Sequence, residues 1–108
     1  MALEVLSMMD GIKYIITPGM IELGEKQYEL NKEFGKQIAK VCDKVYLVGK
    51  NQTKPIQDGL SEAKYNNDNI KIFNQFKAAY NDIIESNGNK KCVILIENDL
   101  PDSFTEAK

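Results

Sequence analysis

Histidine, arginine and tryptophan are absent from the 108 residues of this sequence. The missing histidine removes the commonest general base of enzymes and the commonest metal ligand of proteins. Lysine supplies all 14 basic side chains against 16 acidic ones, which gives a formal net charge of -2. Nucleic-acid-binding domains usually carry a basic excess and use arginine for bidentate contacts. The composition therefore argues against histidine-based catalysis and against a nucleic-acid partner.

Cysteine is scarce, because only Cys42 and Cys92 are present and no C-x-x-C spacing links them. This pattern argues against zinc and favours two buried free thiols in a reducing compartment. No apolar run is long enough to cross a bilayer, and the first residues lack the charged-then-apolar order of a signal peptide. We therefore expect a cytoplasmic protein with no membrane partner and no metal site.

Helical and strand patterns alternate along the chain. Helices are predicted for residues 2–9, 25–42, 54–65 and 75–86, and strands for residues 12–17, 44–49, 70–73 and 91–97. The strands are short apolar runs, typical of a parallel sheet that is buried on both faces. The sequence therefore predicts a single domain, residues 1–108, with a three-layer, Rossmann-like α/β fold of about four strands. Because helices in such folds usually follow strands, the leading helix suggests that the chain starts inside a longer protein.

Each predicted helix carries an apolar stripe at helical spacing. The predicted core-facing residues are Leu3, Leu6 and Met9; Leu30, Phe34, Ile38, Val41 and Cys42; Ile56, Leu60 and Ala63; and Phe76, Ala79, Tyr80 and Ile83. Asn31 lies beside the start of the second stripe. Charged residues cover the opposite faces, so little apolar surface is expected to remain for a protein-interaction role.

Ligands of open parallel sheets bind outside the carboxyl ends of the strands. The first loop at that edge contains Gly19 and Gly24, which flank Met20-Ile21-Glu22-Leu23. One interpretation is a rim where the backbone approaches a ligand and amides face an anion. The other is a plain turn before a helix, with Met20 and Leu23 in the core. Spacing alone favours the turn, since neither G-x-G-x-x-G nor G-x-x-x-x-G-K-[ST] is present.

Two further loops at the same edge carry polar residues. Lys50 follows the second strand and could meet a phosphate or carboxylate, or it could simply be solvated while Thr53 caps the next helix. Glu97, Asp99 and Asp102 follow the last strand and could hold Mg²⁺ or an amine, or form a turn. No nucleophile–base pair is evident. The residues by themselves therefore predict an α/β binding domain without catalytic residues.

The sequence also resembles a known family. Gly19, Met20, Glu22, Leu23 and Gly24 form a close variant of a G-x-M-x-E-L-G stretch, and a later strand ends in Val48-Gly49. This combination resembles the carboxy-terminal domain of the Mur ligases over nearly the whole chain. The resemblance is greatest to the branch that joins D-alanyl-D-alanine to a UDP-N-acetylmuramoyl peptide.

The resemblance implies a Rossmann-like domain that closes over the cleft of a three-domain, ATP-dependent, amide-forming enzyme of peptidoglycan synthesis. ATP and Mg²⁺ would be bound mainly by a central domain outside this chain, and the chain alone would be inactive. The residues that the resemblance places at the cleft are Gly19, Met20, Glu22, Lys50, Asn98 and Asp99. The alternative that we keep is a free-standing α/β module that binds a small ligand or has a regulatory role.

Two departures from the family pattern stand out. Asn31 occupies a position near which many members carry a histidine. Glu97-Asn98-Asp99 stands where a Lys-Gly-Ser stretch is common, which reverses the local charge. The second departure weakens the assignment of the exact amino substrate.

Overall fold

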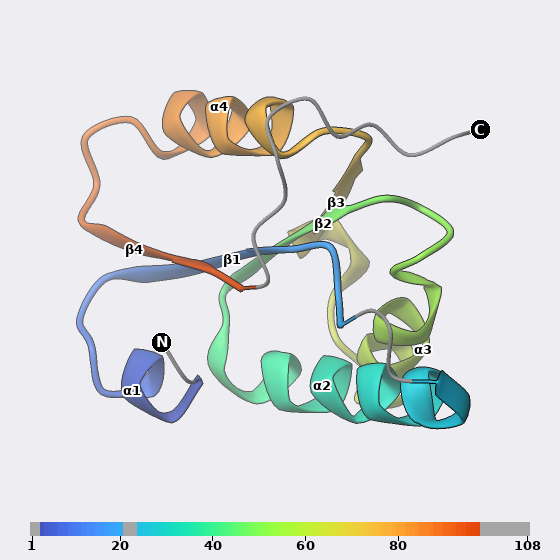
Figure 1. The fold of residues 1–108 in the computed structure, drawn as a ribbon. Helices are drawn as coiled ribbons and strands as arrows, with labels where there is room; N and C mark the ends of the chain where they lie inside the picture. Colours follow the sequence, from blue (N-terminus) through green and yellow to red (C-terminus); the bar gives the residue numbers. More distant parts are fainter. Residues whose placement is uncertain (1–2, 21–23, 98–108) are drawn as a thin grey trace.

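The computed structural model describes residues 3–20 and 24–97 (Figure 1). Its helices are α1 (Leu3–Ser7), α2 (Gln27–Val41), α3 (Lys54–Glu62) and α4 (Phe76–Asn87), with short 3-10 helices η1 (Gly24–Lys26) and η2 (Asn67–Asn69). Its strands are β1 (Ile12–Thr17), β2 (Lys44–Val48), β3 (Ile70–Phe73) and β4 (Cys92–Ile96). The predicted alternation of helices and strands is confirmed.

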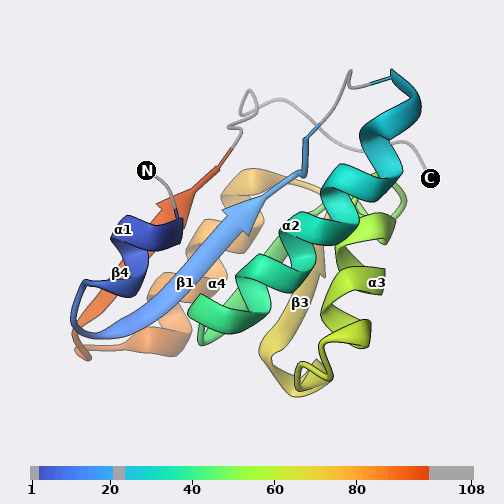
Figure 2. The ribbon, with the colours of Figure 1, turned by 90° about the horizontal axis from the view of Figure 1, so that it is seen from below.

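The strands form one four-stranded sheet in the order β3-β2-β1-β4, and every pair is parallel. In the register of the central strands, Ile15 lies opposite both Val45 and Leu95. Helices α1, α2 and α3 lie on one face of the sheet, and α4 lies on the other (Figures 1 and 2). This arrangement confirms the three-layer, Rossmann-like fold class.

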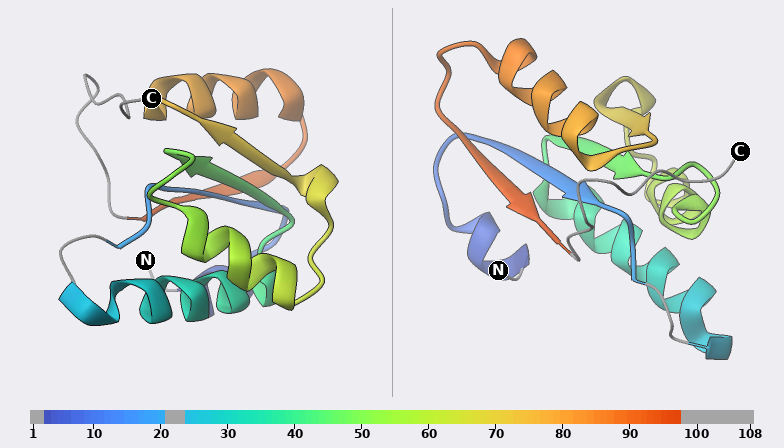
Figure 3. Two further views of the ribbon diagram at one scale, coloured as in Figure 1. Left: turned by 90° about the vertical axis from the view of Figure 1, so that its right-hand side faces the viewer. Right: turned by 45° about the horizontal axis from the view of Figure 1, so that its top comes forward.

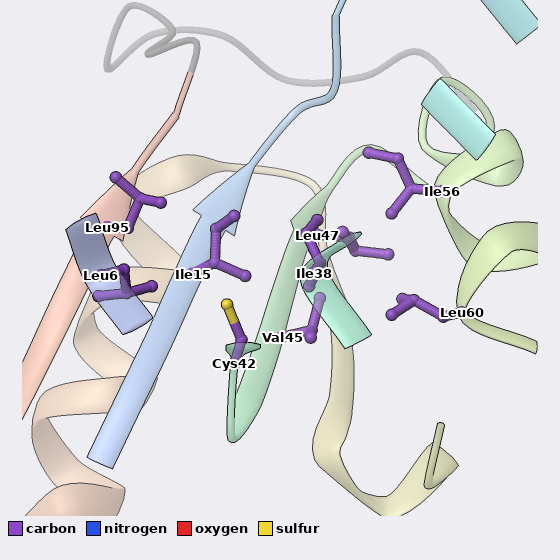
Figure 4. Packing of buried hydrophobic residues seen from close by; sticks show 9 residues of the cluster. All are labelled: Leu6, Ile15, Ile38, Cys42, Val45, Leu47, Ile56, Leu60 and Leu95. Carbon is purple, nitrogen blue, oxygen red and sulfur yellow. The ribbon is translucent and has the colours of Figure 1, made fainter. Parts of the chain in front are cut away.

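The two faces of the sheet bury different side chains. The face toward α2 and α3 is aliphatic, and its buried cluster consists of Leu6, Ile15, Ile38, Cys42, Val45, Leu47, Ile56, Leu60 and Leu95 (Figure 4). The face toward α4 is richer in aromatic rings, and its buried cluster consists of Tyr14, Ile16, Tyr46, Val48, Ala79 and Ile83. We call these the aliphatic face and the aromatic face. Burial on both faces explains why most residues of β1 and β2 are apolar.

Helices α2 and α3 lie side by side on the aliphatic face (Figure 3). Two glycines make this close approach possible. A Cβ atom at Gly35 would overlap the carbonyl oxygen of Ile56, and a Cβ atom at Gly59 would overlap that of Lys32. The two backbones therefore touch where these side chains are missing.

Four predicted core residues are instead exposed, namely Met9, Leu30, Ala63 and Tyr80. Leu30 is 44% exposed because the glycine contact turns α2 so that Asn31, Gly35 and Ile38 face inward. Ala63 lies just past the end of α3 and Met9 just past the end of α1, so neither shares its helix's buried face. Tyr80 stacks on Phe76 with ring centroids 6.1 Å apart while remaining open to solvent.

Both cysteines are free. Cys42 is buried on the aliphatic face, as predicted, whereas Cys92 is only partly buried against the aromatic face. Within residues 3–20 and 24–97, no helix has the length and apolar character that a membrane span requires.

Candidate functional site

The carboxyl ends of β1, β2 and β4 meet at one edge of the sheet. Thr17 at the end of β1 lies opposite Leu47, and Ile16 lies opposite Ile96. The backbone N–H of Glu97 donates to the carbonyl of Ile16 at 3.1 Å, which continues the pairing one residue past β4. The strand ends from which the predicted site loops start therefore lie together.

A buried side chain of α2, Asn31, holds Met20 in the loop after β1. Asn31 is fully buried, although its neighbour Leu30 is exposed. Its Oδ1 accepts the backbone N–H of Met20 at 2.7 Å, and its Nδ2 donates to the carbonyl of Met20 at 2.7 Å. The same Nδ2 donates to the carbonyl of Gln27 at 2.8 Å, so the loop is tied to the first turn of α2.

Gly19 is the residue that lets the loop come this close. Its φ angle of +86° is one that side-chain-bearing residues rarely adopt. A Cβ atom there would lie 3.0 Å from Oδ1 of Asn31 and 3.2 Å from Cδ1 of Ile56. Both the backbone angle and the limited space therefore favour glycine.

A second amide side chain holds the same loop from the β2 side. Nε2 of Gln52 donates to the carbonyl of Pro18 at 3.2 Å and to that of Val48 at 3.1 Å. These contacts bridge the ends of β1 and β2, and they are longer than those of Asn31.

The N–H groups of Gly19 and Met20 are bonded within the protein. Gly19 donates its N–H to Oγ1 of Thr17 at 3.0 Å, Met20 donates to Asn31, and Pro18 has none to donate. The Gly19 and Met20 amides are therefore not available to bind an anion in this conformation. In its described part, residues 18–20, the loop offers a fixed backbone surface.

The loop after β2 is also built around its own backbone. Gly49 donates its N–H to the carbonyl of Phe73 at 2.7 Å, and Oγ1 of Thr53 donates to the carbonyl of Gly49. Thr53 occupies the N-cap position of α3, as predicted, but its side chain makes no capping bond to that helix. Lys50 is exposed on the turn between them.

The predicted cleft residues have three different outcomes. Gly19 is buried and Met20 is partly buried in the loop after β1, and Lys50 is exposed on the neighbouring loop. Glu22, Asn98 and Asp99 lie outside the described residues. Whether any of these residues contacts a ligand stays a prediction.

A hollow of about 350 Å³ lies beside the end of β4. It is lined by Leu3, Glu4, Phe34, Gln37 and Glu97, which combine apolar walls with two carboxylates. No group of three or more carboxylate, thiol or imidazole side chains that could hold a metal ion occurs in the described part of the chain.

Cys42 has no catalytic character. Burial, reinforced by the neighbouring charge of Asp43, raises the pKa of its thiol to about 12. A thiol with this pKa stays protonated at neutral pH, and only the thiolate is a good nucleophile. The structure thus supports the prediction that Cys42 is not an activated nucleophile.

Sequence reasoning missed how Asn31 and Gln52 hold the edge. The available signal for Asn31 was a polar residue beside an apolar stripe, which is also compatible with a solvated position. Its role depends on a partner backbone that lies 11 residues away and in a loop. Gln52 carried no comparable signal.

Comparison with solved structures finds a likeness of fold. No protein-family model and no curated protein sequence matches the chain. Two crystal structures of MurF from Acinetobacter baumannii do match, with TM-scores of 0.68 and 0.67 and 19% sequence identity in each case. The chain shares the fold of part of MurF. The match covers 87% of this chain but only 21% and 20% of the MurF chains, so the chain spans about a fifth of MurF's length. At this identity the likeness to MurF establishes the fold.

Proposed function

We propose that this chain is the carboxy-terminal domain of a Mur-type ligase. The observation that carries the proposal is the shared fold with MurF over 87% of the chain. The stretch Gly19-Met20-Ile21-Glu22-Leu23-Gly24 supports it, because it resembles a family pattern. Gly19 and Met20 also follow the carboxyl end of β1, and ligands of open parallel sheets bind outside such strand ends.

The proposed reaction is the ATP-dependent joining of D-alanyl-D-alanine to a UDP-N-acetylmuramoyl peptide in the cytoplasm, as a step of peptidoglycan synthesis. A carboxylate of the peptide is first converted into an acyl phosphate. The amine of the dipeptide then attacks the acyl carbon, and an amide, ADP and phosphate result. ATP and Mg²⁺ would be held by a central domain outside this chain, and we assign no step involving them to its residues.

The contribution of this chain is to close the cleft and shape its wall. The backbone at Gly19 and Met20 forms a fixed rim, because Asn31 and Gln52 hold it. Fixed positioning of substrates can supply a large part of an enzyme's rate enhancement. Glu22, Lys50, Asn98 and Asp99 are the side chains proposed to face the cleft from this and neighbouring loops.

The first experiment is to determine the size of the native protein in its own cells with an antibody against this domain. A band several times larger than 12.2 kDa would support the ligase proposal. The longer protein should then release ADP only when both the nucleotide-sugar peptide and D-alanyl-D-alanine are present. Glu22→Ala should lower the turnover per folded molecule while largely preserving the free energy of unfolding.

The alternative is a free-standing module that binds a small ligand. A native band at 12.2 kDa would favour this module and contradict the ligase proposal. The 108-residue chain alone should not turn over ATP under the ligase proposal, so ATP hydrolysis by a pure preparation would also count against it.

A further inference from the structure

We propose that Asn31 is the positioning residue of the rim, and that it sets the backbone conformation of Gly19 and Met20 before any ligand arrives. Its use in catalysis rests on the proposed function, whereas its effect on the loop can be tested without it. Asn31 lies in α2 and touches the rim only through its side chain.

The hydrogen-bonding capacity of Asn31 matches the loop closely. A carboxamide offers an acceptor oxygen and two N–H donors. Oδ1 receives the N–H of Met20, and the two donors reach the carbonyls of Met20 and Gln27. Both backbone groups of Met20 are therefore paired with one neutral side chain. A side chain that lacks either the donor or the acceptor would leave one of these groups without its partner.

Burial makes these bonds consequential. Asn31 is fully buried, so water cannot readily replace it if the side chain is removed. A buried polar group that loses its partner costs free energy, and the backbone escapes that cost by moving toward solvent. Without Asn31, the segment around Met20 should therefore open.

Gly19 and Asn31 depend on each other. Because a Cβ atom at Gly19 would lie 3.0 Å from Oδ1 of Asn31, any larger residue there disturbs the same bond. Gly19→Ala is thus an independent way to loosen Met20, acting from the loop side.

Asn87 provides a matched control elsewhere in the molecule. Asn87 is buried at the end of α4. Like Asn31, it bonds to loop backbone, because its Nδ2 donates to the carbonyl of Lys90 at 2.7 Å. Its Oδ1 accepts the hydroxyl of Tyr14 at 3.2 Å. Asn87→Ala removes a similar side chain without touching the rim.

The experiment is amide hydrogen exchange on the 108-residue chain, with Met20 as the reporter and Ile15 and Val45 as reference amides for global opening. Asn31→Ala should speed exchange at Met20 by about tenfold or more relative to the reference amides. Gly19→Ala should act in the same direction. Asn87→Ala should change that ratio by less than about threefold.

Asn31→His tests the chemistry of the bond, because a neutral imidazole keeps one donor and one acceptor. It should retain most of the Met20 protection that Asn31→Ala loses. A folded Asn31→Ala variant with unchanged relative exchange at Met20 would overturn the proposal. If Asn31→Ala does not fold, the other two variants decide. Wild-type protection of Met20 in Asn31→His and lost protection in Gly19→Ala would support the proposal. Lost protection in Asn31→His and wild-type protection in Gly19→Ala would overturn it.

Kinetics on the longer protein separate this inference from the proposed function. If the protein is a ligase, Asn31→Ala should lower kcat/KM for the amino substrate by about tenfold while the KM for ATP changes by less than about threefold. Lost Met20 protection in a protein without ligase activity would support the positioning role and contradict the ligase proposal. An Asn31→Ala variant that keeps both ligase activity and Met20 protection would support the ligase proposal and contradict the positioning role.

Discussion

The two faces of the sheet are covered in different ways. On the aliphatic face, α2 and α3 pack against each other as well as against the sheet, and Gly35 and Gly59 bring their backbones into contact. On the aromatic face, α4 is the helix that covers the strands in the described residues (Figure 1). Two helices in backbone contact therefore close the first face, and a single helix covers the second in the described residues.

The aromatic face compensates with ring contacts and charge. Tyr46 stacks on Phe73 with ring centroids 5.8 Å apart, and Tyr14 lies 6.0 Å from Tyr46. The Tyr46 hydroxyl donates to Asp82 at 2.7 Å, and Nζ of Lys71 donates to the same carboxylate oxygen at 2.9 Å. Tyrosine suits a half-covered surface because its ring is apolar while its hydroxyl can reach a polar partner. The comparison teaches that a face covered by fewer helices can be closed with amphipathic side chains.

The largest expected effect is on the helix contact of the aliphatic face. Gly59→Val would push a branched side chain into the carbonyl of Lys32, so α2 and α3 must separate. We expect a loss of more than about 3 kcal/mol in the free energy of unfolding, measured by urea denaturation. Gly24→Val is the control, since Gly24 has a φ of +66° but an added Cβ would meet nothing within 4 Å. It should cost only about 1–2 kcal/mol, and equal losses for the two variants would contradict the contact.

The next effect compares the two cores directly. Ile38 on the aliphatic face and Ile83 on the aromatic face are both fully buried. Truncation to alanine should cost about 2–5 kcal/mol at either position. Ile38→Ala should cost about 1 kcal/mol more, because α2 is locked to α3 and cannot move to fill the cavity, whereas α4 can shift. Denaturation curves that show Ile83→Ala as the more damaging change would contradict this difference in rigidity.

A smaller effect is a pH dependence of stability that arises on the aromatic face. The hydrogen bonds from Lys71 and then Tyr46 hold the pKa of Asp82 below its usual value. A carboxyl whose pKa is lower in the folded state stabilises the fold above the pKa of the unfolded chain, about 4, and loses that contribution as pH falls through the folded value. Because the side chain is 28% exposed, the contribution should be about 1 kcal/mol or less.

Asp82→Asn should therefore make the loss of stability between about pH 5 and pH 2 shallower. Denaturation at a series of pH values measures the slope. Combining it with Tyr46→Phe in a double-mutant cycle should show a coupling of about 0.5–1 kcal/mol. An unchanged acid slope in Asp82→Asn would show that this carboxylate does not stabilise the aromatic face.

The smallest effect concerns the reactivity of the two cysteine thiols and involves no change in the stability of the fold. Cys42 lies in the aliphatic face with a thiol pKa of about 12, whereas Cys92 is partly exposed beside the aromatic face. A thiol reagent at pH 8 should label Cys92 in the native protein and Cys42 only after denaturation. The Cys92→Ala variant should show no fast labelling, and a fast phase in that variant would mean that the aliphatic face opens readily.

Local sequence patterns predicted the strands better than the helix faces. β1 and β3 have the predicted bounds, because an apolar run between turn residues defines a short strand well. In α2 and α4, one residue of each predicted apolar stripe, Leu30 and Tyr80, is exposed in the structure. Periodicity shows that a helix has an apolar side, but the centre of that side depends on which neighbour comes closest. In α2 that neighbour meets Gly35, which carries no hydrophobic signal of its own.

The meeting of the strand ends at one edge was predicted, but the side-chain bonds that hold the loop there were not. The rule for parallel sheets located the loops after β1, β2 and β4, whereas the approach of a ligand to Gly19 stays a prediction. The bonds from Asn31 and Gln52 were not foreseen, since they join residues that the sequence separates. The proposed ligand contacts of Met20 and Lys50 remain predictions.

The sequence by itself determined the alternation of helices and strands and the parallel sheet. These follow from the hydrophobicity and backbone preferences of neighbouring residues, which act over short stretches of chain. Only the tertiary structure decided that Asn31 faces inward and hydrogen-bonds to Met20. It also decided that α2 and α3 come into backbone contact at Gly35 and Gly59. Those outcomes depend on the distances between backbones that meet only after folding. Hydrogen bonding and steric contact change over fractions of an ångström, so no pattern of residue types alone could specify them.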